Sequence, residues 1–150
     1  MRREDTRSDP DGLDRRGRVT FGAPVTALYA GLCALLLLFL AGLVVNQRRI
    51  SKVGLGDGGN EALARAMRVQ ANFVEYVPLS LVLMVVVEVN GIPAKWLHMA
   101  GVMLIGSRLL HAWGFSHSSG KSFGRMVGTL GTFIVLSALA VLALWVGTGL

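Results

Sequence analysis

The sequence predicts an all-α integral membrane protein, a bundle of four transmembrane helices. Hydrophobic residues make up 53% of the 150-residue chain, and its mean hydropathy is +0.56. Most of them fall into four apolar runs of about 20 residues, the length that crosses the hydrocarbon layer of a bilayer. Backbone polar groups cannot stay unpaired against lipid, so each run is predicted to be a helix.

The first predicted span covers residues 21–45 and contains the run Leu32-Cys-Ala-Leu-Leu-Leu-Leu-Phe-Leu40. This run is too long for a secretory signal, and no small-x-small cleavage site stands out. Cys33, the single cysteine, lies inside it and cannot form an intrachain disulfide. We expect Cys33 to pack as a small apolar residue. No metal-ligand spacing surrounds it, so no metal site is expected.

A loop is predicted next, over residues 46–60, basic in its first half and rich in glycine in its second. Asn60 is predicted to cap the second helix, and Glu61 favours the amino end of that helix. The helix approaches the membrane from Glu61 and is predicted to span it over residues 71–89. Pro78 lies inside this span, where it removes a backbone hydrogen bond and is expected to kink the helix.

The third and fourth spans follow in the same way. Asn90-Gly-Ile-Pro93 predicts a turn into a third span over residues 96–115. Glycines and serines over residues 114–124 predict a loop, and the fourth span covers residues 127–146. Small residues that allow close helix contact lie along the fourth span: Gly128, Gly131, Ser137 and Ala138.

The chain divides into a charged tail, residues 1–20, and the four-helix domain, residues 21–150. The tail has six arginines, five acidic residues and almost no apolar content, so it is predicted to be disordered. A net charge of +6 raises the question of nucleic acid. The basic residues flank the spans, however, and no soluble domain is left to form a groove for a duplex. Nucleic acid is therefore excluded as a partner.

A stripe of polar residues lies at the start of the second helix: Arg65, Arg68, Asn72 and Glu75. These positions advance by three, four and three residues, so they share one helix face. A charged side chain at the bilayer centre costs about 2.5–3.5 kcal/mol on insertion scales, and such residues usually mark a functional site. The stripe therefore needs a partner, which is another helix, a polar ligand, or both.

The topology brings more polar residues to the depth of this stripe. The third helix ends, and the fourth begins, on the side of the membrane where the second helix enters. Arg108 and His111 near the end of the third helix, and Arg125 at the start of the fourth, are therefore predicted to lie near the stripe. Glu88 and His98 are predicted to lie at the opposite interface.

This set of side chains suits a small zwitterionic ligand with more than one carboxylate. Arginine guanidinium groups match carboxylates, and a glutamate matches an ammonium group. An arginine beside a thiol would also favour the reactive thiolate. The alternative is that the charges only neutralise one another inside the bundle. His111 and Tyr76 are ordinary residues when taken singly, whereas Arg108 needs an acceptor in a low dielectric.

The pattern Arg65-x-x-Arg68-x-Gln70-x-Asn72-x-x-Glu75-Tyr76-x-Pro78 resembles the second-helix signature of the MAPEG family, the membrane-associated proteins of eicosanoid and glutathione metabolism. The likeness is strongest to the leukotriene synthase branch. The stretch Gly106-Ser-Arg108-Leu-Leu-His111 is similar to the third-helix pattern of prostaglandin E synthases and bacterial members. The resemblance covers about residues 21–150.

This resemblance implies a homotrimer that binds glutathione, as a co-substrate, between neighbouring subunits. Arg125 is the match for the arginine that stabilises the thiolate, which makes it the candidate catalytic residue. Phe115 departs from the tyrosine of eukaryotic synthases, so one hydroxyl near glutathione is missing. The positions that match or line the glutathione site are Arg68, Gln70, Asn72, Glu75, Tyr76, Arg108 and His111.

The expected function is that of a glutathione transferase in the bacterial inner membrane, with peroxide reduction as a related activity. It would act in detoxification, on hydrophobic electrophiles dissolved in lipid. The expected partners are membrane lipid, the apolar substrate and further copies of the chain. The alternative is a non-catalytic trimer of the same fold that binds lipid or presents a partner.

Overall fold

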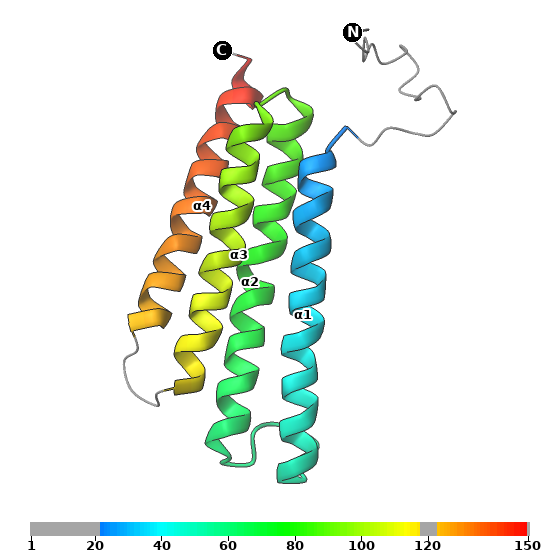
Figure 1. Cartoon of the computed structure of the whole chain (residues 1–150), viewed down its shortest axis with the longest axis vertical. Helices are drawn as coiled ribbons and strands as arrows, with labels where there is room; N and C mark the ends of the chain where they lie inside the picture. The colour runs from blue at the N-terminus through cyan, green and yellow to red at the C-terminus, as the bar shows by residue number, and fades with distance from the viewer. Residues whose placement is uncertain (1–21, 118–122, 150) are drawn as a thin grey trace, which may run out of the picture.

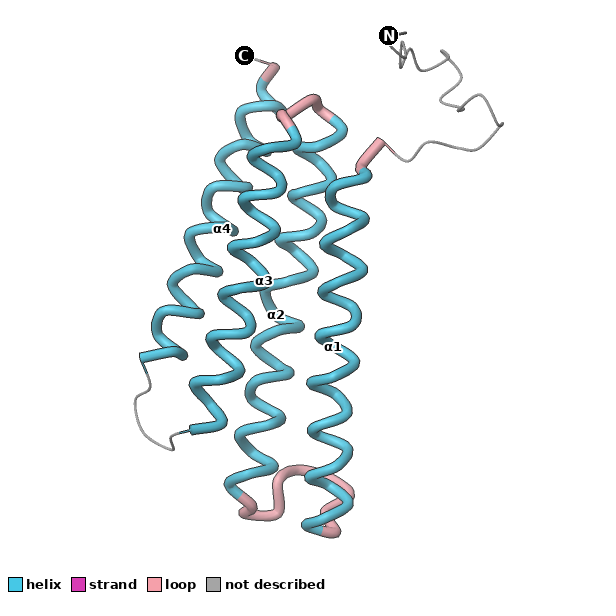
Figure 2. Tube along the Cα trace, in the orientation of Figure 1, coloured by secondary structure: helices cyan, strands magenta, loops and turns pink. Residues whose placement is uncertain are grey.

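The computed structural model describes residues 22–117 and 123–149, which form four long helices. They are α1 (Pro24–Ser51), α2 (Glu61–Val89), α3 (Ala94–His117) and α4 (Phe123–Thr148). The helices lie side by side and alternate in direction along the chain (Figure 1). No strand occurs in the described ranges (Figure 2), so the predicted all-α bundle is confirmed. The predicted tail, residues 1–20, lies outside the described residues.

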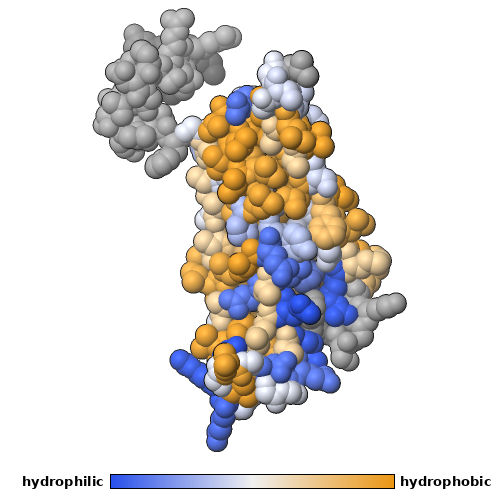
Figure 3. Space-filling model, turned by 180° about the vertical axis from the view of Figure 1, so that it is seen from behind, coloured by the Kyte–Doolittle hydropathy of each residue, from blue (hydrophilic) through white to orange (hydrophobic). Residues whose placement is uncertain are grey.

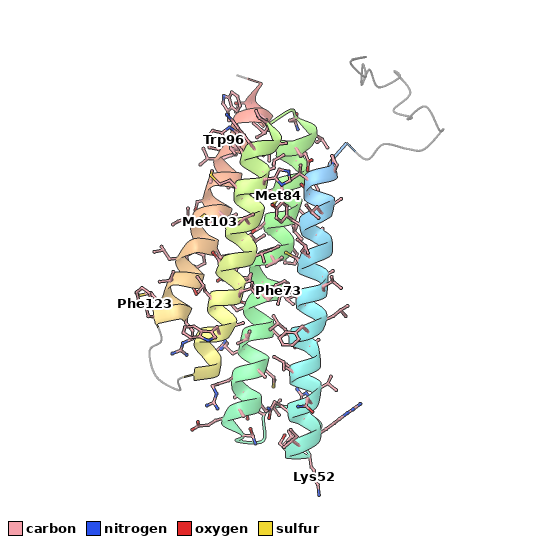
Figure 4. All side chains as sticks on the ribbon, viewed as in Figure 1. Lys52, Phe73, Met84, Trp96, Met103 and Phe123 are labelled. Atoms are coloured by element: carbon pink, nitrogen blue, oxygen red, sulfur yellow. The ribbon has the colours of Figure 1, made fainter. Side chains whose placement is uncertain are left out.

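Helix α2 has a central position that it shares with α3, because each of the two packs against all three other helices. Its buried apolar residues are Leu63, Val69, Phe73, Val77, Met84 and Val87. In Figure 4, Phe73 and Met84 lie within the bundle, whereas Lys52 and Phe123 project away from it. This central position matters for the site, since polar residues on α2 can meet partners on two neighbouring helices.

The outside of the bundle is also hydrophobic. Leu35, Leu38 and Phe39 of α1 are 66%, 69% and 62% exposed, an arrangement that a water-soluble protein rarely shows over a large area. Helices α1, α2 and α4 are long and apolar enough to cross a membrane. Helix α3 carries Arg108 and three histidines within its length, and it lies alongside the other three. The protein is therefore an integral membrane protein in contact with lipid.

The helices extend beyond the predicted spans, because hydropathy marks the part of a helix that suits lipid rather than its full length. Helix α1 continues past its predicted end to Ser51. Arg48 and Arg49 lie in its last turn, where arginine has a high helix propensity and its charge complements the helix dipole. The loop predicted over residues 114–124 is also shorter, since α3 runs to His117 and Gly124 belongs to α4.

The predicted cap of α2 is confirmed, since Oδ1 of Asn60 accepts a hydrogen bond from the backbone N–H of Leu63 at 2.9 Å. The helix then runs through Pro78 without a break. The loop before it is held by Arg48 of α1, whose Nη1 donates to the carbonyl oxygen of Gly56 at 3.0 Å. These contacts fix the end of the bundle where the polar stripe begins.

The amino end of α1 is capped by a residue of α2. Ala23 forms no side-chain cap, and Pro24 has no backbone N–H to offer. The carboxylate of Glu88 accepts hydrogen bonds from the backbone N–H groups of Val25 and Thr26, each at 2.8 Å. It also accepts one from the Thr26 hydroxyl at 2.6 Å. Glu88 therefore complements the positive end of the α1 dipole, a role that the sequence did not indicate.

Candidate functional site

Arg108 is the central side chain of the candidate site, and it joins three helices. Only 3% of the residue is exposed, although arginine is rarely buried. Its Nη1 donates to Oδ1 of Asn72 on α2 at 2.5 Å, and its Nη2 donates to the carbonyl oxygen of Gly128 on α4 at 3.0 Å. The prediction that the second, third and fourth helices meet at one depth is therefore confirmed.

Helices α3 and α4 approach closely at this point because glycine leaves room. A Cβ atom on Gly128 would lie 2.6 Å from the carbonyl oxygen of Ser107 and 2.7 Å from the nitrogen of His111. Both are backbone atoms, which cannot move aside unless a helix shifts. Gly124, one turn earlier, is similarly close to α3, with a backbone oxygen at 3.0 Å. This close approach places an α4 carbonyl within reach of the buried guanidinium.

The hydrogen bonds of Arg108 do not neutralise its charge. Its two acceptors are an amide oxygen and a backbone carbonyl, and neither carries a charge. Its Nε is buried and has no hydrogen-bond partner within the described residues. A buried charge without a counter-ion is costly, and so is a buried donor without an acceptor. An anion bound beside this guanidinium would remove both costs.

The polar stripe of α2 is only partly covered by the described residues of the chain. Arg68 and Glu75 are exposed, and Asn72 is partly buried. Arg65 forms an ion pair with Glu61 at 3.2 Å, so its charge is engaged within α2. Figure 3 shows hydrophilic surface across the lower half of the molecule, below a hydrophobic region. Charged groups on a membrane-spanning helix usually face a polar environment and mark a functional site.

Three further predicted residues each lie about one helical turn from Arg108 or from a residue that Arg108 contacts. Tyr76 packs edge-on against Phe133 of α4, with ring centroids 5.3 Å apart. His111 is 5% exposed and lies against Gly128. Arg125 is partly buried in the first turn of α4, three residues before Gly128. Residues from α2, α3 and α4 therefore surround one region of the bundle.

Gln70 does not join this group. It lies two positions from both Arg68 and Asn72, and residues two apart on a helix do not face each other. Within one protomer Gln70 therefore points away from the polar stripe, where it is partly buried. The side chain of Phe115 lies outside the described residues.

Two contacts that shape the site were not predicted from the sequence: the Gly128 carbonyl as an acceptor for Arg108, and the ring of Phe133 against Tyr76. One signal was present, because Gly124 and Gly128 are four residues apart, the spacing that lets two helices touch along one face. The same Gly128 carbonyl also accepts a hydrogen bond from the hydroxyl of Thr132, one turn later on α4, at 2.9 Å.

The described residues of the site contain neither a cluster of metal ligands nor a cysteine. No group of three or more histidine, cysteine, aspartate and glutamate side chains there could hold a metal ion. Cys33 is 2% exposed and packs in the apolar core, on α1. Any thiol chemistry at the site would therefore use a thiol from a ligand rather than the thiol of Cys33.

Comparison with known proteins extends these observations. The MAPEG family profile matches residues 26–145, a range that contains every residue of the candidate site. Inner membrane protein YecN of Escherichia coli (strain K12) is 39% identical over 121 residues, covering 81% of this chain and 91% of the relative. The YecN protein of Escherichia coli O6:H1 (strain CFT073) matches with the same identity and coverage.

Proposed function

Because this chain belongs to the MAPEG family and is a protein of the bacterial inner membrane, we propose that it is a membrane-embedded glutathione-dependent transferase. Its substrates would be hydrophobic electrophiles that reach the protein through the lipid. The observation that carries the proposal is the buried guanidinium of Arg108, which has two neutral acceptors and one Nε without a partner in the described residues. Glutathione brings the carboxylates that this cation lacks.

The charges of the site match those of glutathione, which has two carboxylates, one ammonium group and one thiol. Arg68 and Arg108 would bind the carboxylates, and Glu75 would bind the ammonium group. Arg125 would stabilise the thiolate, as a cation next to a thiol does. The remaining contacts would come from the uncharged side chains of Asn72, Tyr76 and His111 around the same cleft, and from Gln70 of a neighbouring protomer.

The reaction needs little more than a bound thiolate. Its sulfur attacks the electrophilic carbon of the substrate, a carbon–sulfur bond forms, and the bonding electrons of the broken bond leave with the departing group, which takes up the thiol proton. Peroxide reduction uses the same site, since two thiols are oxidised to a disulfide while a hydroperoxide is reduced to an alcohol and water. In both cases the protein orients the thiolate and excludes bulk water.

A homotrimer completes the proposal. Arg68 and Glu75 are exposed on a membrane-spanning helix, where lipid would leave their charges unpaired. A neighbouring protomer, with glutathione between the two, would cover them. Gln70 points away from the stripe on its own protomer. It would therefore contact glutathione only in the next cleft, on the other side of that protomer. The mass of the purified protein in detergent tests this part separately.

The experiment that tests the ligand is a thermal-shift titration of the purified full chain with glutathione and with S-methylglutathione. A ligand that binds only the folded protein stabilises it, by about 2.7 kcal/mol at a concentration 100 times its dissociation constant. Both compounds should raise the melting temperature, since the carboxylates are present in both. Arg108→Met should abolish the rise, whereas Lys95→Gln at the opposite end of the bundle should preserve it. No stabilisation of the unaltered protein would refute the proposal.

One observation favours a second candidate, a non-catalytic trimer of the same fold. The contacts of Arg108 with Asn72 and Gly128 tie three helices together without any ligand, so they have a structural role of their own. Thiol-dependent turnover separates the two functions. Loss of turnover in Arg125→Ala, with glutathione binding retained, supports the enzyme, whereas glutathione binding without any turnover of the unaltered protein supports the non-catalytic alternative.

A further inference from the structure

An apolar groove of about 770 Å³ lies between α3 and α4, away from the polar site. It extends from Ile92 to Met103 on one side and from Ile134 to Trp145 on the other, toward the end of the bundle that holds the α2–α3 turn. Its volume falls within the range of about 300–1,000 Å³ that is usual for small-molecule sites. It is large enough to accept a ligand.

The groove has a buried floor and exposed walls. Leu97, Val135 and Leu139 form the floor and are at most 3% exposed. Met99 and Val141 stand at the walls and are 58% and 65% exposed. The lining is apolar except for Ser137, so the groove offers almost no hydrogen bond to water or to a polar ligand. It suits a flexible hydrocarbon chain.

The mouth of the groove carries the features of a membrane interface. Trp96 and Trp145 both line it, and tryptophan is enriched where the lipid headgroups meet water. Lys95 is exposed beside Trp96, with its Nζ 5.1 Å from the centroid of the Trp96 ring. Among the described residues at this end of the bundle, Lys95 is the only lysine or arginine. The site therefore combines an apolar channel with one cation at headgroup depth.

We propose that this groove binds an anionic phospholipid, with one acyl chain along the floor and the phosphate beside Lys95. The charge of Lys95 selects the anionic headgroup, because the chain alone would not distinguish one lipid from another. The groove and the proposed glutathione site lie in different parts of the bundle. Lipid binding in the groove can therefore be tested independently of the proposed transferase function.

The test is native mass spectrometry of the full-length protein, titrated with phosphatidylglycerol or with phosphatidylcholine of the same acyl chains. Phosphatidylglycerol should bind about fivefold more tightly, since one basic residue near the surface contributes about 1 kcal/mol. Lys95→Gln should remove this preference, and Lys95→Arg should retain it. Because Lys95 is exposed, neither change should affect folding.

A second pair of variants tests the groove itself. Ala138→Phe places a large side chain in the groove and should abolish the bound lipid. Ala34→Phe is the matched control, because both alanines are exposed and each lies ten residues from the end of its helix at the same end of the bundle. It should leave lipid binding unchanged.

Three results would overturn the proposal. Equal affinity of the unaltered protein for the two lipids would show that Lys95 does not select the headgroup. Full lipid binding by Ala138→Phe would show that the lipid lies elsewhere. A changed mass of the assembly in Ala138→Phe but not in Ala34→Phe would show that a second copy of the chain occupies the groove instead.

Discussion

Arg108 on α3 and Asn72 on α2 form a hydrogen bond of 2.5 Å across 36 positions of the chain, inside the membrane part of the bundle. The bond gives the guanidinium an acceptor but no counter-charge. The bond therefore holds the guanidinium in place while its positive charge remains unbalanced, so that an anion bound beside it would be stabilised. The proposed glutathione site requires this property.

Replacing Asn72 by leucine should destabilise the protein, because the Nη1 donor of Arg108 would lose its acceptor while staying buried. A donor left in this way costs about 1–3 kcal/mol. Arg108→Met removes the charge as well as the donors, so its cost should be smaller. Unfolding in detergent measures both. A larger loss in Arg108→Met than in Asn72→Leu would show that the charge itself stabilises the unliganded protein.

Gly128→Ala should also destabilise the bundle, because the added methyl group would meet two backbone atoms of α3 at 2.6 and 2.7 Å. Overpacking of this kind costs about 1–3 kcal/mol. Gly106→Ala is the control, since a Cβ at Gly106 has nothing within 4 Å and alanine favours a helix over glycine by about 0.5–1 kcal/mol. Equal melting temperatures for the two variants would contradict the close contact of α3 and α4.

Glu88→Gln should loosen the start of α1. The neutral amide offers one acceptor where the carboxylate offers two, and it no longer complements the helix dipole. Loss of a helix cap costs about 0.5–2 kcal/mol. Hydrogen exchange at the amides of Val25 and Thr26 measures the effect directly. Glu61→Gln, at an exposed position on α2, should leave that exchange unchanged.

Arg125→Ala should reduce the rate of glutathione conjugation more than it reduces glutathione affinity. Removing one group that stabilises developing or bound negative charge typically lowers kcat by about 10²–10³-fold. The ultraviolet absorbance of bound thiolate should fall in parallel. Arg65→Ala is the control, because Arg65 is paired with Glu61 on its own helix. Unchanged turnover in Arg125→Ala would assign thiolate stabilisation to another group.

The sequence predicted those features that depend on local composition. Apolar runs located all four helices, and the side chain of Asn60 correctly marked the start of α2. The spacing of Arg68, Asn72 and Glu75 placed them on one face, and the topology brought Arg108 to their depth. These predictions succeeded because helix periodicity and the alternating direction of the spans leave few other arrangements.

The features that the sequence missed depend on contacts between distant segments. Glu88 was assigned only to an interface, because nothing near it in sequence shows that α1 lacks a cap of its own. Glycine is typical of turns, so the sequence places Gly124 in a loop, yet on α4 Gly124 and Gly128 together let α3 come close. The Gly128 carbonyl accepts from Arg108 because the two helices approach this closely, and no local pattern in the sequence indicates that hydrogen bond.

The capping of α1 by Glu88 has a consequence for biosynthesis. The acceptor for the amide of Thr26 lies 62 positions later in the chain, so a ribosome completes α1 well before the residue that closes its amino end. A nascent α1 therefore enters the membrane with that end unfinished. The amino end of α1 gains its last hydrogen bonds only when α2 crosses the membrane in the opposite direction and brings Glu88 beside it. The smallest unit that inserts with all of these bonds formed is therefore the α1–α2 hairpin rather than either helix alone.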